Sequence, residues 1–294
     1  MTDMIQGFWV AIATPLDAAG NVDHAHFVRH AKFLFDQGVD GIVPFGTTGE
    51  GTSFSATERL HAVDALLKAG IAPAKIALGT GCPAITDSIA LTKAALAAGL
   101  HHVLLLPPYF YRDADAQGIE DAFAAIIDGV GDTRLRATLY HIPQVSGVAV
   151  PAAALANLRK RYGATVAGVK DSSADFAQFQ AFRAAAPDVS VTIGNEADIA
   201  RALAEGGAGT ICGMANIAPA LVAALFKSPE AAGPMKQAIA LMSGPFCPTL
   251  KSALAAQTGE PGWLRVRAPL RPAAASIGLA IAEGIRSLGM AKAA

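Results

Sequence analysis

Short apolar runs alternate with segments of helical periodicity along most of the chain. The runs that we expect to form strands are 8–13, 41–45, 75–79, 102–106, 135–140, 165–169, 189–193 and 209–212. Their nearly continuous apolar character is typical of parallel strands that are covered on both faces.

Helices are predicted between these runs. The clearest boundary is Ser55-Ala56-Thr57-Glu58, a capping box, and Gly70 can end the helix that it begins. The segments with helical periodicity are 24–37, 55–70, 84–98, 117–129, 151–161, 174–185, 196–205 and 217–227. Eight β-then-α units with short connections predict an α/β fold, the (β/α)8 or TIM barrel. A doubly wound sheet is the alternative, but no GxGxxG follows the first run.

The alternation stops after about residue 228. Three further helical segments, 229–242, 247–258 and 269–289, form a predicted C-terminal helical extension. We therefore expect a barrel domain over 1–227 and a three-helix extension over 228–294. No Pro/Gly/Ser-rich linker separates the two, so the extension should pack on the barrel.

Composition narrows the class of protein. Apolar residues make up 52% and charged residues 16%, yet no apolar run approaches the roughly 20 residues of a membrane span. The net charge of −1, without a basic block, argues against nucleic acid and membrane partners. The three cysteines, Cys82, Cys212 and Cys247, suggest neither a disulfide framework nor a zinc cluster. Because the start, MTDMIQGFWV, also shows no signal peptide, a cytoplasmic protein is expected.

The predicted barrel directs attention to the residues that follow its strands, because active sites of such barrels lie at the carboxyl ends. The segments found there are GTTGEG (46–51), PPYFY (107–111), YHIP (140–143), KDSS (170–173), GNE (194–196) and GMAN (213–216).

Lys170 stands directly behind the apolar residues 166–169. Loss of solvation there would disfavour the ammonium and leave some free amine near neutral pH. A free amine attacks a ketone to give a Schiff base, whose iminium withdraws electrons from the neighbouring carbon. The alternative interpretation is a lysine whose stem packs on the barrel and whose amine reaches water.

Two other segments suit the same chemistry. Tyr140 ends the adjacent predicted strand, where its phenol would relay protons, although a core tyrosine is the alternative. The two glycines and two hydroxyls of the GTTGEG turn suit a small carboxylate, and a plain strand-to-helix turn is the alternative.

Three segments together carry a family resemblance. GTTGE (46–50), YHIPQVSG (140–147) and GVKDSS (168–173) resemble the dihydrodipicolinate synthase / N-acetylneuraminate lyase family of class I aldolases. ATPL (13–16), GNEAD (194–198) and the helical tail also fit, so the resemblance covers essentially the whole chain.

The resemblance implies roles for individual residues. Lys170 would form a Schiff base with pyruvate or another 2-oxo acid, and Tyr140 would shuttle protons. Thr47 and Thr48 would bind the substrate carboxylate and connect to Tyr140 by hydrogen bonds. No cofactor is expected beyond the covalent Schiff base on Lys170.

The resemblance also implies a pocket and an assembly. Gly194, Glu196 and Gly213 would line the pocket for the rest of the substrate. Members of this family are commonly tetramers built as pairs of dimers, so a homotetramer or homodimer is expected.

Two departures from the family pattern bear on the synthase activity. The synthases carry an arginine five residues after the strand-five tyrosine, and Val145 stands there. Valine cannot pair with a carboxylate. Phe110 aligns with a tyrosine that the synthases reach across the dimer interface. Phenylalanine cannot relay a proton, so Tyr109 or Tyr111 would substitute, or the relay would be shorter.

Other positions separate the branches of the family. YHIPQVSGV is similar to the YNIPALSGV of the sialic acid lyases, but His141 replaces their asparagine and Ala197 replaces a glutamate. KDSS is similar to the 2-keto-3-deoxy sugar acid aldolases. The pocket therefore matches none of the three branches fully.

The histidines give little sign of a metal site. His26 and His30 stand four apart on a predicted helix, but the sequence places no acidic third ligand with them, so solvated helix histidines are expected. His141 follows Tyr140 and would either touch the substrate or make a structural hydrogen bond. Asp171 should point away from Lys170, because strand neighbours alternate faces.

The leading hypothesis is a Schiff-base lyase or aldolase that acts on a 2-oxo acid, with pyruvate and an aldehyde as products or substrates. A dehydratase of 2-keto-3-deoxy acids or a synthase-type condensation on the same scaffold are the alternatives. A third hypothesis, from another class, is a non-catalytic sensor of 2-oxo acids.

Overall fold

A computed structural model describes residues 4–289, and it has the (β/α)8 barrel fold followed by C-terminal helices, which confirms the predicted fold class. The strands lie in the sheet order β2-β1-β8-β7-β6-β5-β4-β3. Residues 1–3 and 290–294 lie outside the described residues. They include the first residues of the predicted barrel domain and of the segment MTDMIQGFWV, and the last residues of the predicted extension.

All eight predicted strands are confirmed, with ends that differ by a few residues. They are β1 (Gly7–Val10), β2 (Gly41–Ile42), β3 (Ala77–Gly79), β4 (His102–Leu105), β5 (Arg136–His141), β6 (Val166–Asp171), β7 (Ser190–Ile193) and β8 (Gly209–Cys212). Tyr140 lies within β5 as predicted, whereas β6 runs two residues further than predicted, so that Lys170 belongs to the strand itself.

The predicted helices are present as well. They are α1 (His24–Asp36), α2 (Ala56–Lys68), α3 (Ile85–Ala97), α4 (Ala116–Val130), α6 (Ala152–Tyr162), α7 (Phe176–Ala185), α8 (Ile199–Ala204), α9 (Pro219–Leu225), α10 (Ala232–Ala240), α11 (Phe246–Thr258) and α12 (Ala275–Ser287). The capping box before α2 is formed as predicted, because Ser55 and Glu58 each accept from the other's backbone N–H.

Two helical features differ from the prediction. The short helix α5 (Pro143–Ser146) was not expected, and a proline at its first position begins it while Gly147 ends it. The last helix begins at Ala275 and not at 269, because Pro269 and Pro272 cannot donate within a helix.

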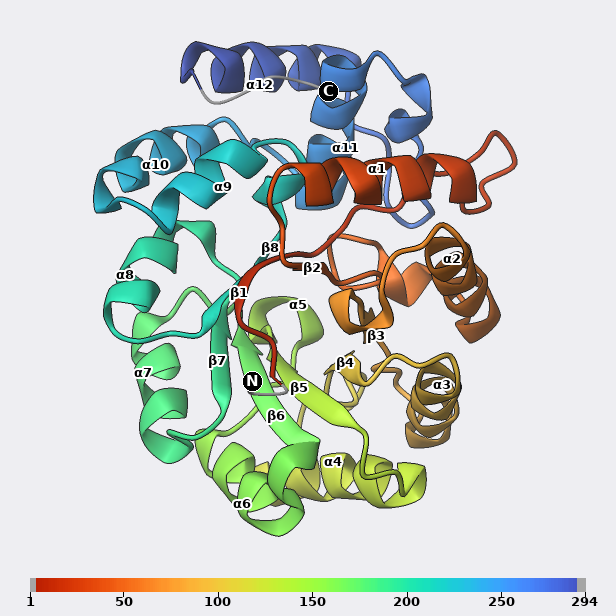
Figure 1. Cartoon of the computed structure of the whole chain (residues 1–294), viewed down its shortest axis with the longest axis vertical. Helices are drawn as coiled ribbons and strands as arrows, with labels where there is room; N and C mark the ends of the chain where they lie inside the picture. Colours follow the sequence, from red (N-terminus) through yellow and green to blue (C-terminus); the bar gives the residue numbers. More distant parts are fainter. Residues whose placement is uncertain (1–3, 290–294) are drawn as a thin grey trace. The chain divides into compact units, whose positions relative to one another are not determined.

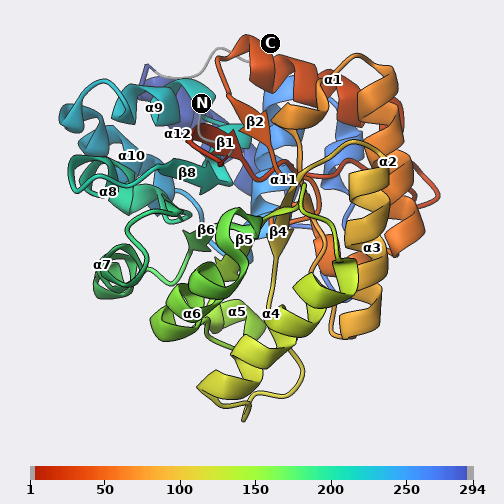
Figure 2. The ribbon, with the colours of Figure 1, turned by 60° about the horizontal axis from the view of Figure 1, so that its bottom comes forward.

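The chain divides into two compact units. The first unit consists of the residues up to Trp9 together with Ala72–Ile211. It contains strands β3 to β7 and most of β1 and β8. Its strands pair in parallel, and Tyr140 is the register partner of Lys170. α6 and α7 both pack against β6, and Figures 1 and 2 show the helices of this unit outside its strands.

The second unit comprises Val10–Ile71 and resumes at Cys212. It groups β2, α1 and α2 with α9, α10, α11 and α12. Figure 1 shows α12 lying along the end of α11, against which it packs. The helices after residue 228 therefore share a compact unit with an early segment of the chain, and the predicted boundary at residue 228 stays a prediction.

The interiors of both units are apolar, with buried phenylalanines on α1, α4 and α7. None of the helices in the described part of the chain combines the length and the apolar character that crossing a bilayer requires.

Candidate active site

Lys170 is buried in the first unit, with 3% of its surface exposed. Parallel pairing of β5 and β6 places Tyr140 beside it, and the Lys170 Nζ lies 4.1 Å from the centroid of the Tyr140 ring. Residues that pair across parallel strands point to the same face, so the two side chains share one surface of the sheet. The predicted burial of this lysine is confirmed.

No carboxylate forms an ion pair with Lys170 among the residues that the structure describes. Its amine faces the ring of Tyr140, which provides a packing surface but no full counter-charge. A buried lysine without an acidic partner is unusual, because a buried charge is normally paired. This environment is the kind that enzymes use to keep an amine reactive.

Gly194 lies against Lys170. Its N–H donates to the carbonyl of Asp171 at 2.6 Å. A Cβ at Gly194 would be 2.0 Å from the Ser172 Oγ and 3.0 Å from the Lys170 Cε, so a larger residue would displace both side chains. The structure thus brings Gly194 to Lys170, and it adds Ser172, which the sequence analysis had not singled out.

Two further predicted site residues of this unit, Glu196 and Phe110, lie nearer the surface. Glu196 is half-buried and begins a 3₁₀ turn, Glu196–Asp198. Phe110 is 76% exposed, and its ring centroid lies 5.4 Å from that of Tyr111, which is 73% exposed. Their contacts with a substrate stay predictions.

His141 is buried, and its environment is structural. Its Nδ1 accepts the N–H of Val150 at 2.9 Å, and its ring packs edge-on to Phe182 at 5.3 Å. Burial lowers the pKa of His141 to about 4, so the imidazole is neutral near pH 7 with its proton on Nε2. These contacts account for the burial of His141, and its role toward a substrate stays a prediction.

Asp171, the register partner of His141, is likewise buried. Its Oδ1 accepts the N–H of Ser173 at 2.9 Å, while its Oδ2 has no hydrogen-bond partner among the described residues. Burial raises the pKa of this carboxyl. Asp171 forms no ion pair with Lys170, and strand neighbours point to opposite faces, as the sequence analysis expected.

The GTTGEG turn lies in the second unit and has an unusual backbone. Phe45, which precedes the turn, and Glu50, its fifth residue, adopt the left-handed conformation with φ of 58° and 55°. A Cβ at Gly51 would be 1.9 Å from the carbonyl oxygen of Phe45, so this position requires glycine. Left-handed backbone at non-glycine residues is disfavoured and persists where surrounding contacts enforce it.

Thr48 and Gly213 lie together within this unit. A Cβ at Gly213 would be 2.9 Å from the Thr48 Oγ1 and 2.7 Å from the ring of Phe246. Phe246 begins α11 and is 37% exposed. The sequence analysis predicted the first two residues but missed Phe246, since only the folded chain brings the C-terminal helix to this turn.

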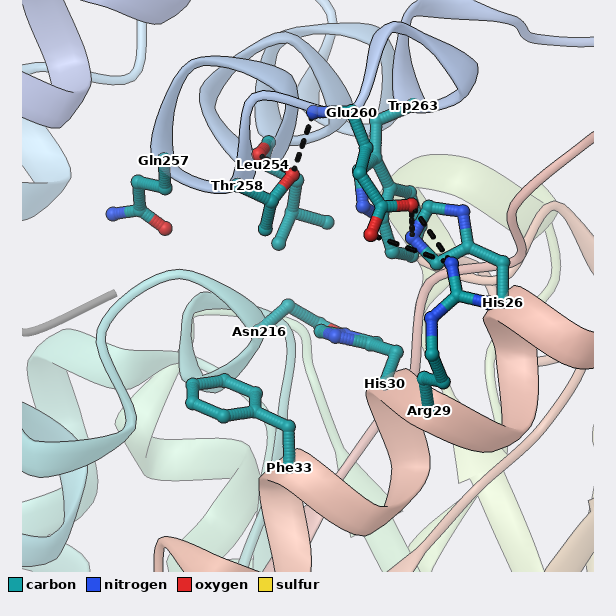
Figure 3. A pocket seen from close by; sticks show the side chains of 10 residues that line it. All are labelled: His26, Arg29, His30, Phe33, Asn216, Leu254, Gln257, Thr258, Glu260 and Trp263. Carbon is teal, nitrogen blue, oxygen red and sulfur yellow. Dashed lines mark hydrogen bonds and ion pairs between the residues drawn. The ribbon is translucent and has the colours of Figure 1, made fainter. Parts of the chain in front are cut away.

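A separate cavity of about 260 Å³ lies between α1, α11 and the 3₁₀ turn Pro261–Leu264. Figure 3 shows Glu260 between His26 and Arg29, with which it pairs at 2.9 and 3.0 Å. The expectation of solvated histidines is wrong, because His26 and His30 are each only 5% exposed. The ring of Trp263, from the C-terminal region, covers both.

The structure also places an acid at His26 that the sequence did not indicate. Glu260 meets His26, whereas His30 bonds through Nε2 to Asn216 at 2.9 Å. Burial lowers the pKa of His30 to about 4. Within the described ranges, no group of three histidine, cysteine, aspartate or glutamate side chains is placed to hold a metal ion.

Asn216 links this cavity to the end of β8. Its Oδ1 accepts the N–H of Ala13 at 3.0 Å, and its Nδ2 donates to the carbonyls of Ala11 and Gly213 at 2.9 and 2.7 Å. The amide thereby fixes the backbone of Gly213, the residue next to Thr48. The asparagine of the GMAN segment thus positions the backbone of Gly213.

Comparisons with known proteins identify the family to which the chain belongs. The profile of the Dihydrodipicolinate synthetase family matches residues 4–272. A protein of Chloroflexus aurantiacus named "Uncharacterized DapA-like lyase" is 35% identical over 239 residues, which cover 81% of this chain and 79% of that protein. The 4-hydroxy-tetrahydrodipicolinate synthase of Acidiphilium cryptum is 32% identical over 241 residues, which cover 82% and 80%.

The solved structures agree with the sequence comparisons. The crystal structure of dihydrodipicolinate synthase from Agrobacterium tumefaciens superposes with a TM-score of 0.90 at 30% identity, covering 97% of this chain and 99% of that one. The barrel fold and the match over nearly the whole length of the chain therefore agree. The chain belongs to the dihydrodipicolinate synthetase family, and it is a lyase of that family.

Proposed function

We propose that this lyase acts through a Schiff base between Lys170 and a 2-oxo acid, and that it cleaves or joins pyruvate and an aldehyde. The observation that carries the proposal is the burial of Lys170 against Tyr140 without an ion-pair partner among the described residues. A lysine in bulk solvent, or one held by a carboxylate, would be less suited to attack a ketone at this place in the barrel.

The reaction follows from the properties of an amine beside a phenol. The Lys170 amine attacks the ketone carbon, and loss of water gives an iminium. The iminium accepts the electron pair of the breaking carbon–carbon bond, which releases an aldehyde and leaves an enamine. Protonation and hydrolysis then release pyruvate and restore the amine. Tyr140 is the proposed proton carrier, and Lys170 serves as the electron sink, so the chemistry requires no separate cofactor.

Binding of the substrate carboxylate is assigned to Thr47 and Thr48. Their turn is held in a strained backbone conformation, and Thr48 is 6% exposed beside Gly213. Amides and hydroxyls of such a turn suit an anion of a few atoms. Gly194 is assigned to the surroundings of Lys170 and Gly213 to those of Thr48, because a side chain at either position would clash with these neighbours.

The substrate favoured by this pattern is a 2-keto-3-deoxy sugar acid or a related compound. Val145 is 59% exposed and stands where the synthases carry an arginine, so an acidic second substrate has no guanidinium at this position. Synthase-type condensation is the second candidate, because the Acidiphilium and Agrobacterium relatives bear synthase names. Dehydration on the same iminium is the third.

Trapping with borohydride tests the mechanism. The protein incubated with pyruvate and borohydride should gain a permanent adduct on Lys170, which peptide mass spectrometry locates, and the Lys170→Met variant should gain none. Folded wild-type protein that gains no adduct would contradict the mechanism.

A panel of 2-keto-3-deoxy sugar acids tests the reaction class. Formation of pyruvate and an aldehyde indicates an aldolase, and loss of water alone indicates a dehydratase. Adduct formation without turnover of any compound, in either direction, would instead favour a sensor of 2-oxo acids.

A homotetramer or homodimer and a cytoplasmic location remain proposals from the family pattern. Light scattering at several protein concentrations tests the assembly, and the exposed pair Phe110 and Tyr111 is the first place to look for a contact between copies.

A further inference from the structure

The ion pair between Glu50 and Lys251 has no part in the proposed chemistry, yet both side chains are 0% exposed. The Lys251 Nζ lies 2.7 Å from the Glu50 Oε1, and the backbone N–H of Arg267 donates to the Glu50 Oε2 at 3.0 Å. Both carboxylate oxygens therefore have partners. Burying two charges has a large desolvation cost, so such pairs are weak evidence for stability and are retained in some proteins for conformational specificity.

Glu50 is the fifth residue of the GTTGEG turn. Like Phe45, which precedes the turn, it has a left-handed backbone conformation although it is not a glycine. A residue in this conformation relaxes unless other contacts hold it. Its carboxylate is held by α11 through Lys251 and by the chain after α11 through Arg267. The side chain of Glu50 is thus the attachment point of a strained turn.

A second contact from the same helix face holds the other end of the turn. The Cys247 Sγ donates to the carbonyl of Thr47 at 3.2 Å, and Cys247 stands four residues before Lys251 on α11. Residues four apart lie on one face of a helix. The helix therefore holds the turn at Thr47 and at Glu50, and Thr48 lies between these two points.

We propose that Lys251 is a positioning residue for substrate binding: through Glu50 it holds the GTTGEG turn in the conformation that presents Thr47 and Thr48 to the substrate carboxylate. Lys251 itself touches no substrate. Burial lowers the pKa of Lys251, and the adjacent Glu50 opposes that shift. The 2.7 Å contact with the Glu50 Oε1 occupies the amine, which suits a positioning role and not nucleophilic attack. The inference rests on the proposed function, because it takes these threonines as the carboxylate site.

The test separates binding from chemistry. In Lys251→Met, the pyruvate concentration that gives half-maximal borohydride trapping on Lys170 should rise about tenfold or more, because small misplacements of binding groups are costly. Maximal trapping at saturating pyruvate should change less than threefold. Lys251→Arg keeps the charge and should lie between this variant and wild type. Lys236→Met, on the exposed face of α10, is the matched control and should behave as wild type.

A second variant guards against loss of folding. Glu50→Gln with Lys251→Met leaves no lone buried charge, while the glutamine oxygen can still accept the N–H of Arg267. Its half-saturating pyruvate concentration should rise as in Lys251→Met.

The outcomes distinguish the two proposals. A wild-type half-saturation value in either folded variant would overturn the positioning role of Lys251 alone. Absence of any adduct in wild-type protein would overturn the proposed function, and this inference with it.

Discussion

Among the described residues, two lysines are almost completely buried, and they differ in the group that faces the amine. Lys170 on β6 is 3% exposed, and its Nζ lies 4.1 Å from the ring centroid of Tyr140. Lys251 on α11 is 0% exposed, and its Nζ lies 2.7 Å from a carboxylate oxygen of Glu50. Burial alone therefore does not identify a reactive lysine.

The contrast shows how the partner decides the role. A carboxylate at hydrogen-bond distance stabilises the ammonium, so the lysine joins two segments of the chain through an ion pair. Lys170 instead faces the ring of Tyr140, which leaves its amine without a carboxylate partner among the described residues.

Replacement of the lysine on β6 should have the largest effect. Lys170→Met should reduce lyase activity by about 10⁵-fold or more, because the covalent step is lost. The free energy of unfolding should change little or rise, since an unpaired buried amine is removed. Steady-state kinetics and urea unfolding measure the two effects. A stable variant that retains activity would contradict the assignment of Lys170.

Replacement of the lysine on α11 should instead affect mainly the stability of the protein. Lys251→Met should lower the free energy of unfolding by about 3–5 kcal/mol, because Glu50 is left as a lone buried charge. Adding Glu50→Gln should recover most of that loss. Urea unfolding of the single and double variants checks this, and a single variant as stable as wild type would mean that the pair contributes no such penalty.

Removal of one hydroxyl separates packing from proton transfer. Tyr140→Phe keeps a ring over Lys170 but loses the phenol, so kcat should fall about 10²- to 10³-fold. Borohydride trapping should still modify Lys170, only more slowly. Single-turnover trapping and steady-state rates together test the prediction, and an unchanged kcat would assign the proton transfer elsewhere.

Crowding of Lys170 by a larger residue at position 194 should have a moderate effect. Gly194→Ala places a methyl group 2.0 Å from the Ser172 Oγ and 3.0 Å from the Lys170 Cε, so the rate of trapping should fall about 10- to 100-fold. Adding Ser172→Ala removes the closest contact and should recover part of the rate. No recovery in the double variant would show that the clash with Ser172 is not the cause.

The smallest effect concerns pH. The pKa of His141 is lowered from 6.5 to about 4 by burial, so the unfolded chain binds its proton more tightly. The stability contribution of His141 is complete above about pH 6.5 and is lost as the pH falls toward 4, by about 1–3 kcal/mol.

His141→Asn is the matched variant for this test. The amide oxygen can still accept the N–H of Val150, but the residue no longer titrates. Unfolding in urea between pH 4 and 7 should show a flatter pH dependence for the variant. Equal slopes in the two proteins would mean that His141 contributes nothing to it.

The lysine on β6 and its surroundings were predictable from local sequence. An apolar run ending in a charged residue, and a second run ending in tyrosine, indicate adjacent strands, and parallel register then pairs Tyr140 with Lys170. The GTTGEG turn was recognisable because glycines and hydroxyls stand together after a strand. Each of these signals is contained in a few consecutive residues.

The support of the turn was not predictable in the same way. The sequence of α11 is that of an ordinary helix at Phe246, Cys247 and Lys251. Nothing near these positions in sequence indicates that they contact Gly213, Thr47 and Glu50. The histidines of α1 gave the same difficulty, because Trp263 and Glu260 come from the far end of the chain. Long-range partners of this kind carry no local pattern.

The sequence by itself determined the succession of strands and helices, the (β/α)8 class and the residues with reactive groups, because hydrophobic periodicity, capping and turn chemistry act between near neighbours. Only the tertiary structure decided which buried lysine has a carboxylate partner and which has an aromatic one. The physical reason is that the free energy of a buried charge depends on the groups packed around it, and folding brings those groups from distant parts of the chain.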